Sequence, residues 1–153
     1  MNDEDFLRQA IALAERAVRE GIGQPFGAVV VRDGRVVGEG CNLVPSSCDP
    51  TAHAETVAIR DACQKLGTTT LEGCTIYASC QPCAMCLAAI HLARIERLVF
   101  AVSADTAATF GFDSRHLYER LREPPGLPTT QLLADEGSAV LRLGARKTPP
   151  AAG

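Results

Sequence analysis

Two short motifs carry residues that can bind a metal ion. "PTAHAE" places His53 and Glu55 two positions apart after a proline, and "QPCAMC" places Cys83 and Cys86 three positions apart. At the start of a predicted helix, that spacing puts both sulfurs on one face, and the helix N-terminus favours thiolates there. One imidazole with two thiolates is a zinc ligand set that leaves the fourth position for water, as catalytic zinc requires. The pattern predicts one catalytic Zn²⁺ held by His53, Cys83 and Cys86.

Glu55 has a role other than metal ligation in this prediction. Two helical residues two apart point about 200° away from each other, so His53 and Glu55 can share a site only off the end of their helix. Asp49 as N-cap and Pro50 as the first helical residue would place both in the first turn. Because two thiolates cancel the charge of the metal, a nearby carboxylate is needed to take a proton from the attacking water. Glu55 is therefore predicted to be the catalytic proton carrier.

Each motif alone has a simpler interpretation. The cysteine pair alone fits buried thiols, a redox pair or half of a structural zinc site, and His53 alone fits a structural histidine. A structural zinc site would need a fourth protein ligand, for which Cys80 and Cys48 are the candidates. The combination of both motifs favours the catalytic interpretation. The other residues of these types are read as packing, structural or solvated: Cys41, Cys48, Cys63, Cys74, His91 and His116.

The composition is typical of one folded domain. The chain has 153 residues, 46% of them hydrophobic, and a formal net charge of −3 without a long basic run, which argues against a nucleic-acid partner. Seven cysteines, an odd number, favour metal ligands and buried thiols over a disulfide framework. The first twenty residues do not resemble a signal peptide, and no apolar run is long enough to cross a bilayer. We expect a cytoplasmic protein without membrane contact.

Hydrophobic periodicity and turn signals predict an α/β fold in a single domain over residues 1–145, followed by a disordered tail over 146–153. Asp33-Gly34 between two β-rich runs predicts a hairpin. Helices and strands are expected, in chain order, as a helix from Asn2 or Asp3 to Gly21, the hairpin, a helix from Pro50 to Gly67, a strand over 74–79, a helix opened by Pro82 over 82–94, a strand over 97–102, a short helix over 114–123 and a last strand over 129–134.

Over roughly residues 1–130 the sequence resembles the cytidine deaminase-like superfamily, and within it the bacterial guanine deaminases. The motifs that carry the resemblance are "PFGAVVV", "GEGCN", "DPTAHAE", "AIRDAC", "SCQPCAMCLAAI" and "GFDS…LYE". It implies a three-layer α/β/α sandwich around a five-stranded mixed sheet, and a homodimer in which a C-terminal segment is exchanged and caps the partner's active site.

The resemblance also implies substrate contacts. Phe26 would contact the face of the base, Asn42 would hydrogen-bond to it, and the backbone around Ala54 would add a polar contact. Phe112, within "GFDS", is a further expected contact. These types suit a planar heterocycle, which needs an apolar slot with a few fixed polar groups.

Three departures from the guanine deaminase pattern bear on the substrate. Guanine deaminases carry an aspartate in the loop before "GFD" that helps to move protons on the purine, and the alignment puts Thr106 there, with Asp105 beside it. The resemblance therefore implies substrate contacts at these two positions, and either Asp105 does this work from a shifted loop or the substrate differs. The C-terminal segment from Leu132 onward has no aromatic residue. "PCAMC" replaces the usual "PCPMC", a form that tRNA adenosine deaminases also have.

The expected activity is zinc-dependent hydrolytic deamination of a free nucleobase, guanine to xanthine with release of ammonia. The sequence leaves open another aminated heterocycle or nucleoside, namely guanosine, cytosine, cytidine or an amino-triazine. It also leaves open a tRNA adenosine deaminase and, from a different class, a non-catalytic structural zinc protein.

Overall fold

The computed structural model describes residues 1–122 and 126–147. They belong to two compact units, which divide between Glu119 and Arg120. No helix in these described ranges has the length and hydropathy needed to span a membrane.

A four-stranded mixed sheet forms the centre of the first unit, in the order β2-β1-β3-β4. Its strands are β1 (Gly27–Arg32), β2 (Arg35–Cys41), β3 (Cys74–Cys80) and β4 (Arg97–Val102). β1 runs antiparallel to β2 and β3, whereas β3 and β4 are parallel. The predicted hairpin is confirmed, because Asp33 and Gly34 both have positive φ, 50° and 72°, as a two-residue type I′ turn requires.

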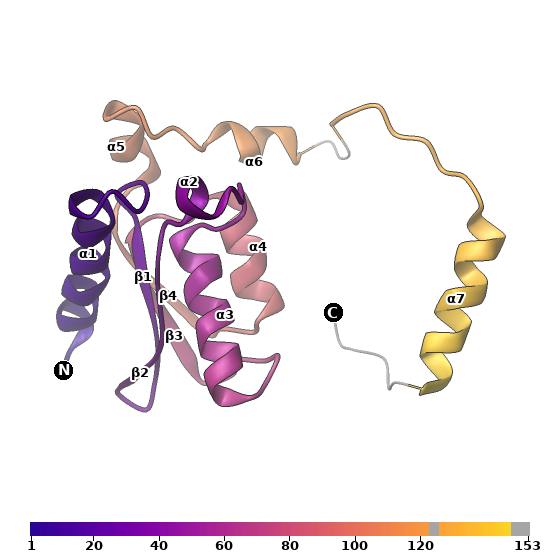
Figure 1. The fold of residues 1–153 in the computed structure, drawn as a ribbon, viewed down its shortest axis with the longest axis horizontal. Coiled ribbons are helices and arrows are strands. Elements are labelled where there is room, and N and C mark those ends of the chain that lie inside the picture. Colours follow the sequence, from indigo (N-terminus) through magenta and orange to yellow (C-terminus); the bar gives the residue numbers. More distant parts are fainter. Residues whose placement is uncertain (123–125, 148–153) are drawn as a thin grey trace. The chain divides into compact units, whose positions relative to one another are not determined.

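Helices cover both faces of the sheet, so the α/β/α sandwich is confirmed (Figure 1). α1 (Asp3–Arg19) lies on one face, where Phe6 packs with Val29, Val31 and Tyr77. α3 (Ala54–Leu66) and α4 (Ala84–Leu92) lie on the other. The side chains that alternate along β1 thus face opposite cores, as the strand period of two dictates.

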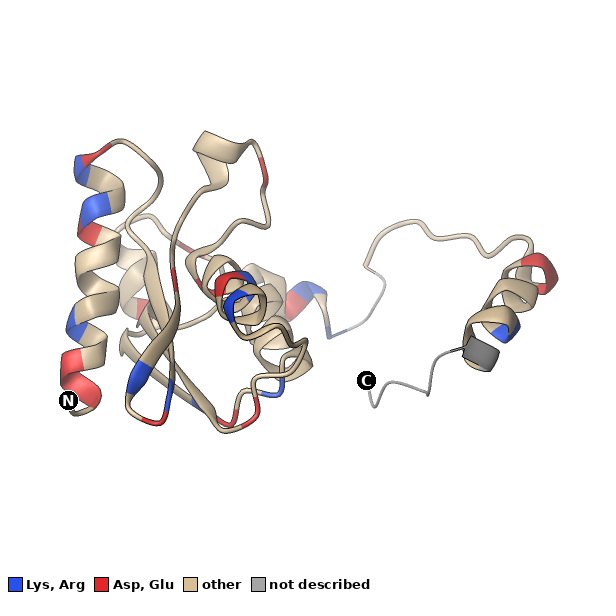
Figure 2. Ribbon diagram, turned by 60° about the horizontal axis from the view of Figure 1, so that its bottom comes forward, with Lys and Arg blue, Asp and Glu red and all other residues tan. Residues whose placement is uncertain are grey.

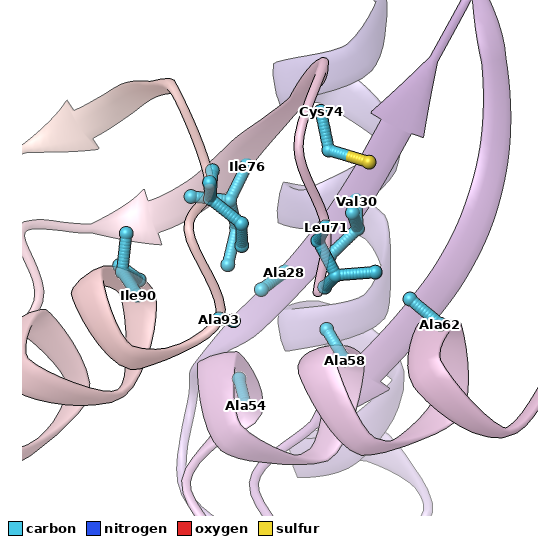
Figure 3. Close-up of a cluster of buried hydrophobic side chains, with 11 residues drawn as sticks. Ala28, Val30, Ala54, Ala58, Ala62, Leu71, Cys74, Ile76, Ile90 and Ala93 are labelled. Atoms are coloured by element: carbon cyan, nitrogen blue, oxygen red, sulfur yellow. The ribbon is translucent and has the colours of Figure 1, made fainter. Parts of the chain in front are cut away.

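α3 packs close to the sheet because the side chains on both facing surfaces are small. Ala54, Ala58 and Ala62 are fully buried on one face of α3 and point toward the sheet residues Ala28 and Val30 (Figure 3). On β2, a Cβ added to Gly40 would lie 2.5 Å from the Ala54 carbonyl oxygen. Glycine there lets the first turn of α3 rest directly on β2, which fixes the position of the residues that begin this helix.

A capping box starts α1 and an ion pair ties it to the sheet. The Asn2 side chain accepts a hydrogen bond from the Asp5 N–H, and the Asp5 carboxylate accepts one from the Asn2 N–H. Asp3 accepts hydrogen bonds from the Tyr77 hydroxyl at 2.7 Å and from the Arg97 guanidinium at 2.9 Å and 2.5 Å. Acidic and basic residues are interspersed along α1 (Figure 2), and ion pairs join Arg8 to Glu4 and Arg19 to Glu15.

The remaining helices are α2 (Val44–Ser47), α5 (Ala104–Thr109), α6 (His116–Arg120) and α7 (Ala134–Lys147). The strand predicted over 129–134 is wrong, since residues 129–133 are irregular and α7 follows them. α7 has Asp135 and Glu136 in its first turn, where the helix dipole favours acids. The described residues therefore form a sheet of four strands and not five.

The boundaries expected at the C-terminus are tested in part. Residues 146 and 147 belong to α7, while the rest of the tail, 148–153, lies outside the described residues. The single domain over residues 1–145 stays a prediction.

Candidate functional site

The N-termini of α3 and α4 bring the two motifs together. His53 is the N-cap of α3 and Cys83 is the N-cap of α4, both with extended backbone. The predicted starts at Pro50 and Pro82 are therefore wrong by a few residues. Asp49 caps a turn instead of the helix, because its carboxylate accepts from the Thr51 N–H at 2.8 Å and its carbonyl accepts from the Ala52 N–H. His53 consequently lies just off the helix end, as a site shared with Glu55 requires.

The three predicted ligands form a cluster that fits zinc. The His53 Nδ1 atom lies 3.6 Å from the Cys83 Sγ and 3.5 Å from the Cys86 Sγ. Zinc bound tetrahedrally to sulfur at about 2.3 Å and nitrogen at about 2.0–2.1 Å separates those atoms by about 3.6 Å. Among the residues that the structure describes, no other group of three His, Cys, Asp or Glu side chains lies close enough together to hold a metal ion. Neither Cys80 nor Cys48 joins the cluster, and His53 and Cys83 line a cavity, so three protein ligands fit a catalytic zinc, which keeps one position for water.

Without a metal, the two thiols share a proton unequally. The hydrogen bond from Cys86, with help from His53, lowers the pKa of the Cys83 thiol to about 4. The same hydrogen bond, together with burial, raises the pKa of Cys86. The hydrogen bond to Cys83 raises the pKa of His53. Zinc requires both thiolates and a neutral imidazole, so binding displaces these protons.

Glu55 stands beside the ligands and not among them. Its carboxylate is buried, with 7% of the residue exposed, and its Oε2 lies 3.3 Å from the Cys86 Sγ. Burial raises the pKa of Glu55. A carboxyl group whose charged form is disfavoured holds a proton more readily, which suits a group that must both take and return one.

A cavity of about 250 Å³ opens over the metal site. His53, Glu55 and Cys83 line its floor, and Phe26 and Phe112 line it as an edge-to-face pair with ring centroids 5.4 Å apart. An aromatic pair of this kind offers an apolar wall to a flat ring. The structure thus brings both expected aromatic residues to the cavity.

Asn42 presents a hydrogen-bond donor to the cavity. It is 2% exposed, and its Oδ1 accepts from the backbone N–H groups of Gln24 at 3.3 Å and Val44 at 3.1 Å. With the oxygen engaged, the amide NH₂ is the end left for a ligand. A Cβ on Gly23 would collide with the Asn42 backbone, so a glycine is needed where this loop meets Asn42.

Ala54 can contribute only its backbone. Its methyl group is buried in the core, but as the first residue of α3 its N–H has no acceptor within the helix.

Asp105 and Thr106 are not among the residues that line the cavity. Both are exposed on α5, and the Asp105 side chain is 86% exposed and ion-paired with Arg115. Ala104 and Ala107, on the opposite face of the same helix, line the cavity in their place. The expected acid at this position is therefore not brought to the site.

Four polar residues that the sequence did not single out also line the cavity: Gln24, Gln81, Asp113 and Ser114. Three of them lie in or beside motifs of the sequence. Asp113 and Ser114 belong to the "GFDS" motif. Gln81 directly precedes the Pro-Cys-x-x-Cys pattern and accepts a hydrogen bond from the Ala104 N–H through its Oε1 at 2.9 Å.

Comparison with known proteins agrees with this geometry. A family model for the cytidine and deoxycytidylate deaminase zinc-binding region matches residues 1–102. The chain is 49% identical over 124 residues to a guanine deaminase of Bacillus subtilis (strain 168), which covers 81% of this chain and 80% of that one. It is 44% identical over 101 residues to a tRNA-specific adenosine deaminase of Aquifex aeolicus (strain VF5), covering 66% of each chain.

A solved structure is similar over almost the whole length. The X-ray structure of guanine deaminase from Bacillus subtilis superposes with a TM-score of 0.91 at 42% identity, covering 98% of both chains. The resemblance inferred from the motifs is confirmed.

Proposed function

The chain belongs to the cytidine and deoxycytidylate deaminase zinc-binding family, and from this premise we propose that it converts guanine to xanthine and ammonia by hydrolysis. The observation that carries the proposal is the pairing of the His53, Cys83 and Cys86 cluster with a buried carboxylate, in a chain 49% identical to a guanine deaminase. Zinc bound to the cluster would supply Lewis acidity and lower the pKa of water.

Glu55 moves the protons in this proposal. Its carboxylate takes one from the attacking water and delivers it to the ring nitrogen beside the amino-bearing carbon. A second transfer through the same carboxyl group makes ammonia the leaving group. The burial of Glu55 supports the assignment, because burial raises the pKa of its carboxyl group, which then holds a proton more readily than an exposed carboxyl group does.

The cavity residues hold the base. Phe26 and Phe112 bound its flat faces, and the Asn42 NH₂ donates to a ring acceptor or carbonyl oxygen. Ala54 is not among the residues that line the cavity, but its N–H, next in the chain to the ligand His53, is a further donor in this proposal. A base held between fixed groups gains the orientation that makes the attack effectively unimolecular.

The second candidate is a tRNA adenosine deaminase, favoured by the 44% identity to such an enzyme. A polyanion needs a basic rim, and the formal charge of −3 supports the small-molecule alternative. The nucleoside and amino-triazine alternatives share all the chemistry and differ only in what the cavity mouth admits.

We also propose that the protein forms a homodimer in which the C-terminal segment is exchanged. α7 and the residues before it carry exposed apolar side chains that a neighbour could cover: Leu132, Leu133, Val140, Leu141 and Leu143. The cytoplasmic location stays a prediction.

Ammonia release by zinc-loaded protein tests the proposal, with guanine, guanosine, cytosine, cytidine, adenine, ammeline and a tRNA anticodon stem-loop assayed in parallel. The proposal expects strong turnover of guanine. Activity on the stem-loop with none on guanine would instead support the RNA-editing alternative. Inactivity on all of them, with zinc bound, would leave the structural zinc protein.

A further inference from the structure

We propose that the Tyr118 hydroxyl holds one wall of the cavity in place over the metal site, which makes Tyr118 a positioning residue for substrate binding. Residues 111–118 form this outer wall, and the first four of them, 111–114, line the cavity. Tyr118 itself is not among the lining residues. The inference rests on the proposed function, because the cavity is taken to hold guanine, and it adds a residue to which the chemistry assigns no part.

A hydrogen bond joins the outer wall to the start of a ligand-bearing helix. The Tyr118 hydroxyl donates to the Pro82 carbonyl at 2.8 Å. Pro82 directly precedes Cys83, which is the N-cap of α4 and one of the three expected zinc ligands. The hydrogen bonds within a helix begin at the carbonyl of its N-cap residue, so the Pro82 carbonyl is free to accept from a side chain.

The Pro82 side of this bond is fixed by the sheet and by α4. On one side of Pro82, the Gln81 N–H donates to the Val102 carbonyl at 2.7 Å, where β3 and β4 end. On the other side, the Leu87 N–H donates to the Cys83 carbonyl at 2.9 Å and so closes the first turn of α4. Since the acceptor is held independently, the hydrogen bond restrains the outer wall and not the metal ligand.

Contacts within the outer wall carry this restraint to the cavity. The Tyr118 N–H donates to the Arg115 carbonyl at 3.1 Å, and the Leu117 N–H donates to the Ser114 carbonyl at 3.2 Å. The Arg115 guanidinium donates to the Asp113 carboxylate at 2.8 Å. These contacts join the end that carries Tyr118 to the lining residues 113 and 114, so the position of one end sets that of the other.

The first end of the outer wall has its own support. The Phe112 N–H donates to the Ala107 carbonyl at 3.1 Å, and the Phe112 ring packs edge-to-face on Phe26. Phe112 is therefore held on the cavity by α5 and by the residue that precedes β1. The part of the wall beyond Phe112 depends on contacts farther along the chain.

An ion pair and the Tyr118 hydrogen bond restrain that far part. The Arg115 guanidinium pairs with Asp105 at 3.0 Å, but the Asp105 side chain is 86% exposed, and exposed ion pairs contribute little. The Tyr118 hydroxyl instead reaches a fixed carbonyl. The first compact unit ends at Glu119, so Tyr118 anchors the outer wall where the chain leaves this unit.

This arrangement predicts a separate effect on KM and kcat. If only the closed wall binds the base, the apparent affinity falls in proportion to the fraction of molecules whose wall is closed. A base that has bound stabilises the closed wall through its own contacts, so the chemical step proceeds as before. Loss of the anchor should therefore raise KM and leave kcat nearly unchanged.

Tyr118→Phe tests the inference, because it removes the hydroxyl and keeps the ring. For the zinc-loaded variant we expect KM for guanine to rise by about 2- to 10-fold, the size of one neutral hydrogen bond. Its kcat should stay within about twofold of wild type and its zinc content should not change. Amide hydrogen exchange of residues 111–118 should become faster by about 2- to 10-fold or more, while exchange in β1 stays as in wild type.

Tyr77→Phe is the matched control, since the chain has two tyrosines. The Tyr77 hydroxyl donates to Asp3 at 2.7 Å, and its ring packs with Phe6 of α1, away from the cavity. The control thus loses the same atom and a hydrogen bond of nearly the same length. It should be less stable than wild type and keep the wild-type KM and the wild-type exchange of residues 111–118. An equal rise in KM in both variants would show general destabilisation and overturn the role of Tyr118.

The outcomes separate this inference from the proposed function. A wild type that does not deaminate guanine overturns the proposed function, while the exchange comparison still tests the anchor. Unchanged exchange of residues 111–118 in Tyr118→Phe overturns the inference, and so does faster exchange with an unchanged KM in a protein that deaminates guanine. A loss confined to kcat also overturns it, because Tyr118 would then act in the chemical step. Failure of Tyr118→Phe to fold or to bind zinc counts against it equally, since a residue of the outer wall should affect neither.

Discussion

The Glu55 carboxylate lies 3.3 Å from the Cys86 thiol, so the proposed proton carrier touches a metal ligand without belonging to the ligand set. Removing this carboxylate should leave the metal in place and stop the chemistry. We expect Glu55→Ala and Glu55→Gln to bind zinc stoichiometrically and to lose about 10²- to 10⁴-fold in kcat, or more, because general acid–base catalysis is gone. Zinc content by elemental analysis and ammonia release measure the two effects.

The glutamine variant is the sharper of the two because it keeps the shape of the buried side chain. Loss of zinc from Glu55→Gln, or nearly normal turnover, would show that Glu55 is a ligand or a bystander.

Zinc should stabilise the fold, because its three ligands come from the starts of two helices that pack on the sheet. A metal that binds only the folded state at about a thousand times its dissociation constant adds roughly 4 kcal/mol. For a chain of this size, chelation should then lower Tm on the order of 10 °C. Differential scanning calorimetry with and without a chelator measures the change.

Two cysteine variants give the matched comparison. Cys83→Ser should carry little zinc and show a Tm that no longer responds to chelator, whereas exposed Cys48→Ser should behave as wild type. Zinc loss from Cys48→Ser would instead make it a fourth ligand and revive the structural zinc protein.

Asp3 makes stability depend on pH through its contacts with Arg97 and Tyr77. The Arg97 hydrogen bond, followed by that from Tyr77, lowers the pKa of Asp3 from 3.8 to about 2. A depressed folded-state pKa means that the contribution is present above the unfolded pKa, near 4, and is lost as the pH falls toward 2. The urea midpoint of Asp3→Asn should therefore lie below that of wild type at pH 7, with a gap that narrows below pH 4.

The zinc ligands are protonated in acid in wild type and in Asp3→Asn alike. The difference between the urea midpoints of these two proteins therefore reports on Asp3 alone. Glu4→Gln, in the same helical turn but paired only with exposed Arg8, is the control and should show a smaller gap. A gap independent of pH would contradict the ionic origin of the effect.

The sequence predicted what depends on local pattern. The Asp33-Gly34 turn and the apolar period of α1 are local signals, and the zinc cluster follows from two motifs that each begin a helix. The start of α3 was missed because an aspartate before a proline can cap either a helix or a turn, and only the contacts of Asp49 with Thr51 and Ala52 decide.

Local sequence pattern could not predict which residues of the 104–115 segment face the cavity. Residues 104–109, for which the sequence analysis named no element, form α5. Residues three apart share one face of this helix, so Ala104 and Ala107 line the cavity while Asp105 and Thr106 are exposed. Asp113 gains its position through Arg115, a contact that no periodicity encodes. The strand expected over 129–134 failed because β-propensity without a partner strand does not make a sheet.

The last prediction concerns Asn42, because the oxygen and the NH₂ group of its side-chain amide have different roles. Its Oδ1 secures the backbone at Gln24 and Val44, while the NH₂ faces the cavity. Asn42→Asp keeps an oxygen for the backbone donors and replaces the donor in the cavity by an acceptor. We expect the variant to fold and to bind zinc, and kcat/KM for guanine to fall by about 10²-fold or more, because an acceptor then faces an acceptor on the base.

Asn42→Ala separates the two tasks. It removes both ends and leaves two backbone N–H groups without an acceptor, which should cost about 1–3 kcal/mol per group in the free energy of unfolding as well as activity. Equal losses of stability in the two variants, measured by urea unfolding, would show that Asn42 acts on the fold alone. A stable Asn42→Asp with full activity would remove Asn42 from substrate recognition and leave that role to the other polar residues that line the cavity.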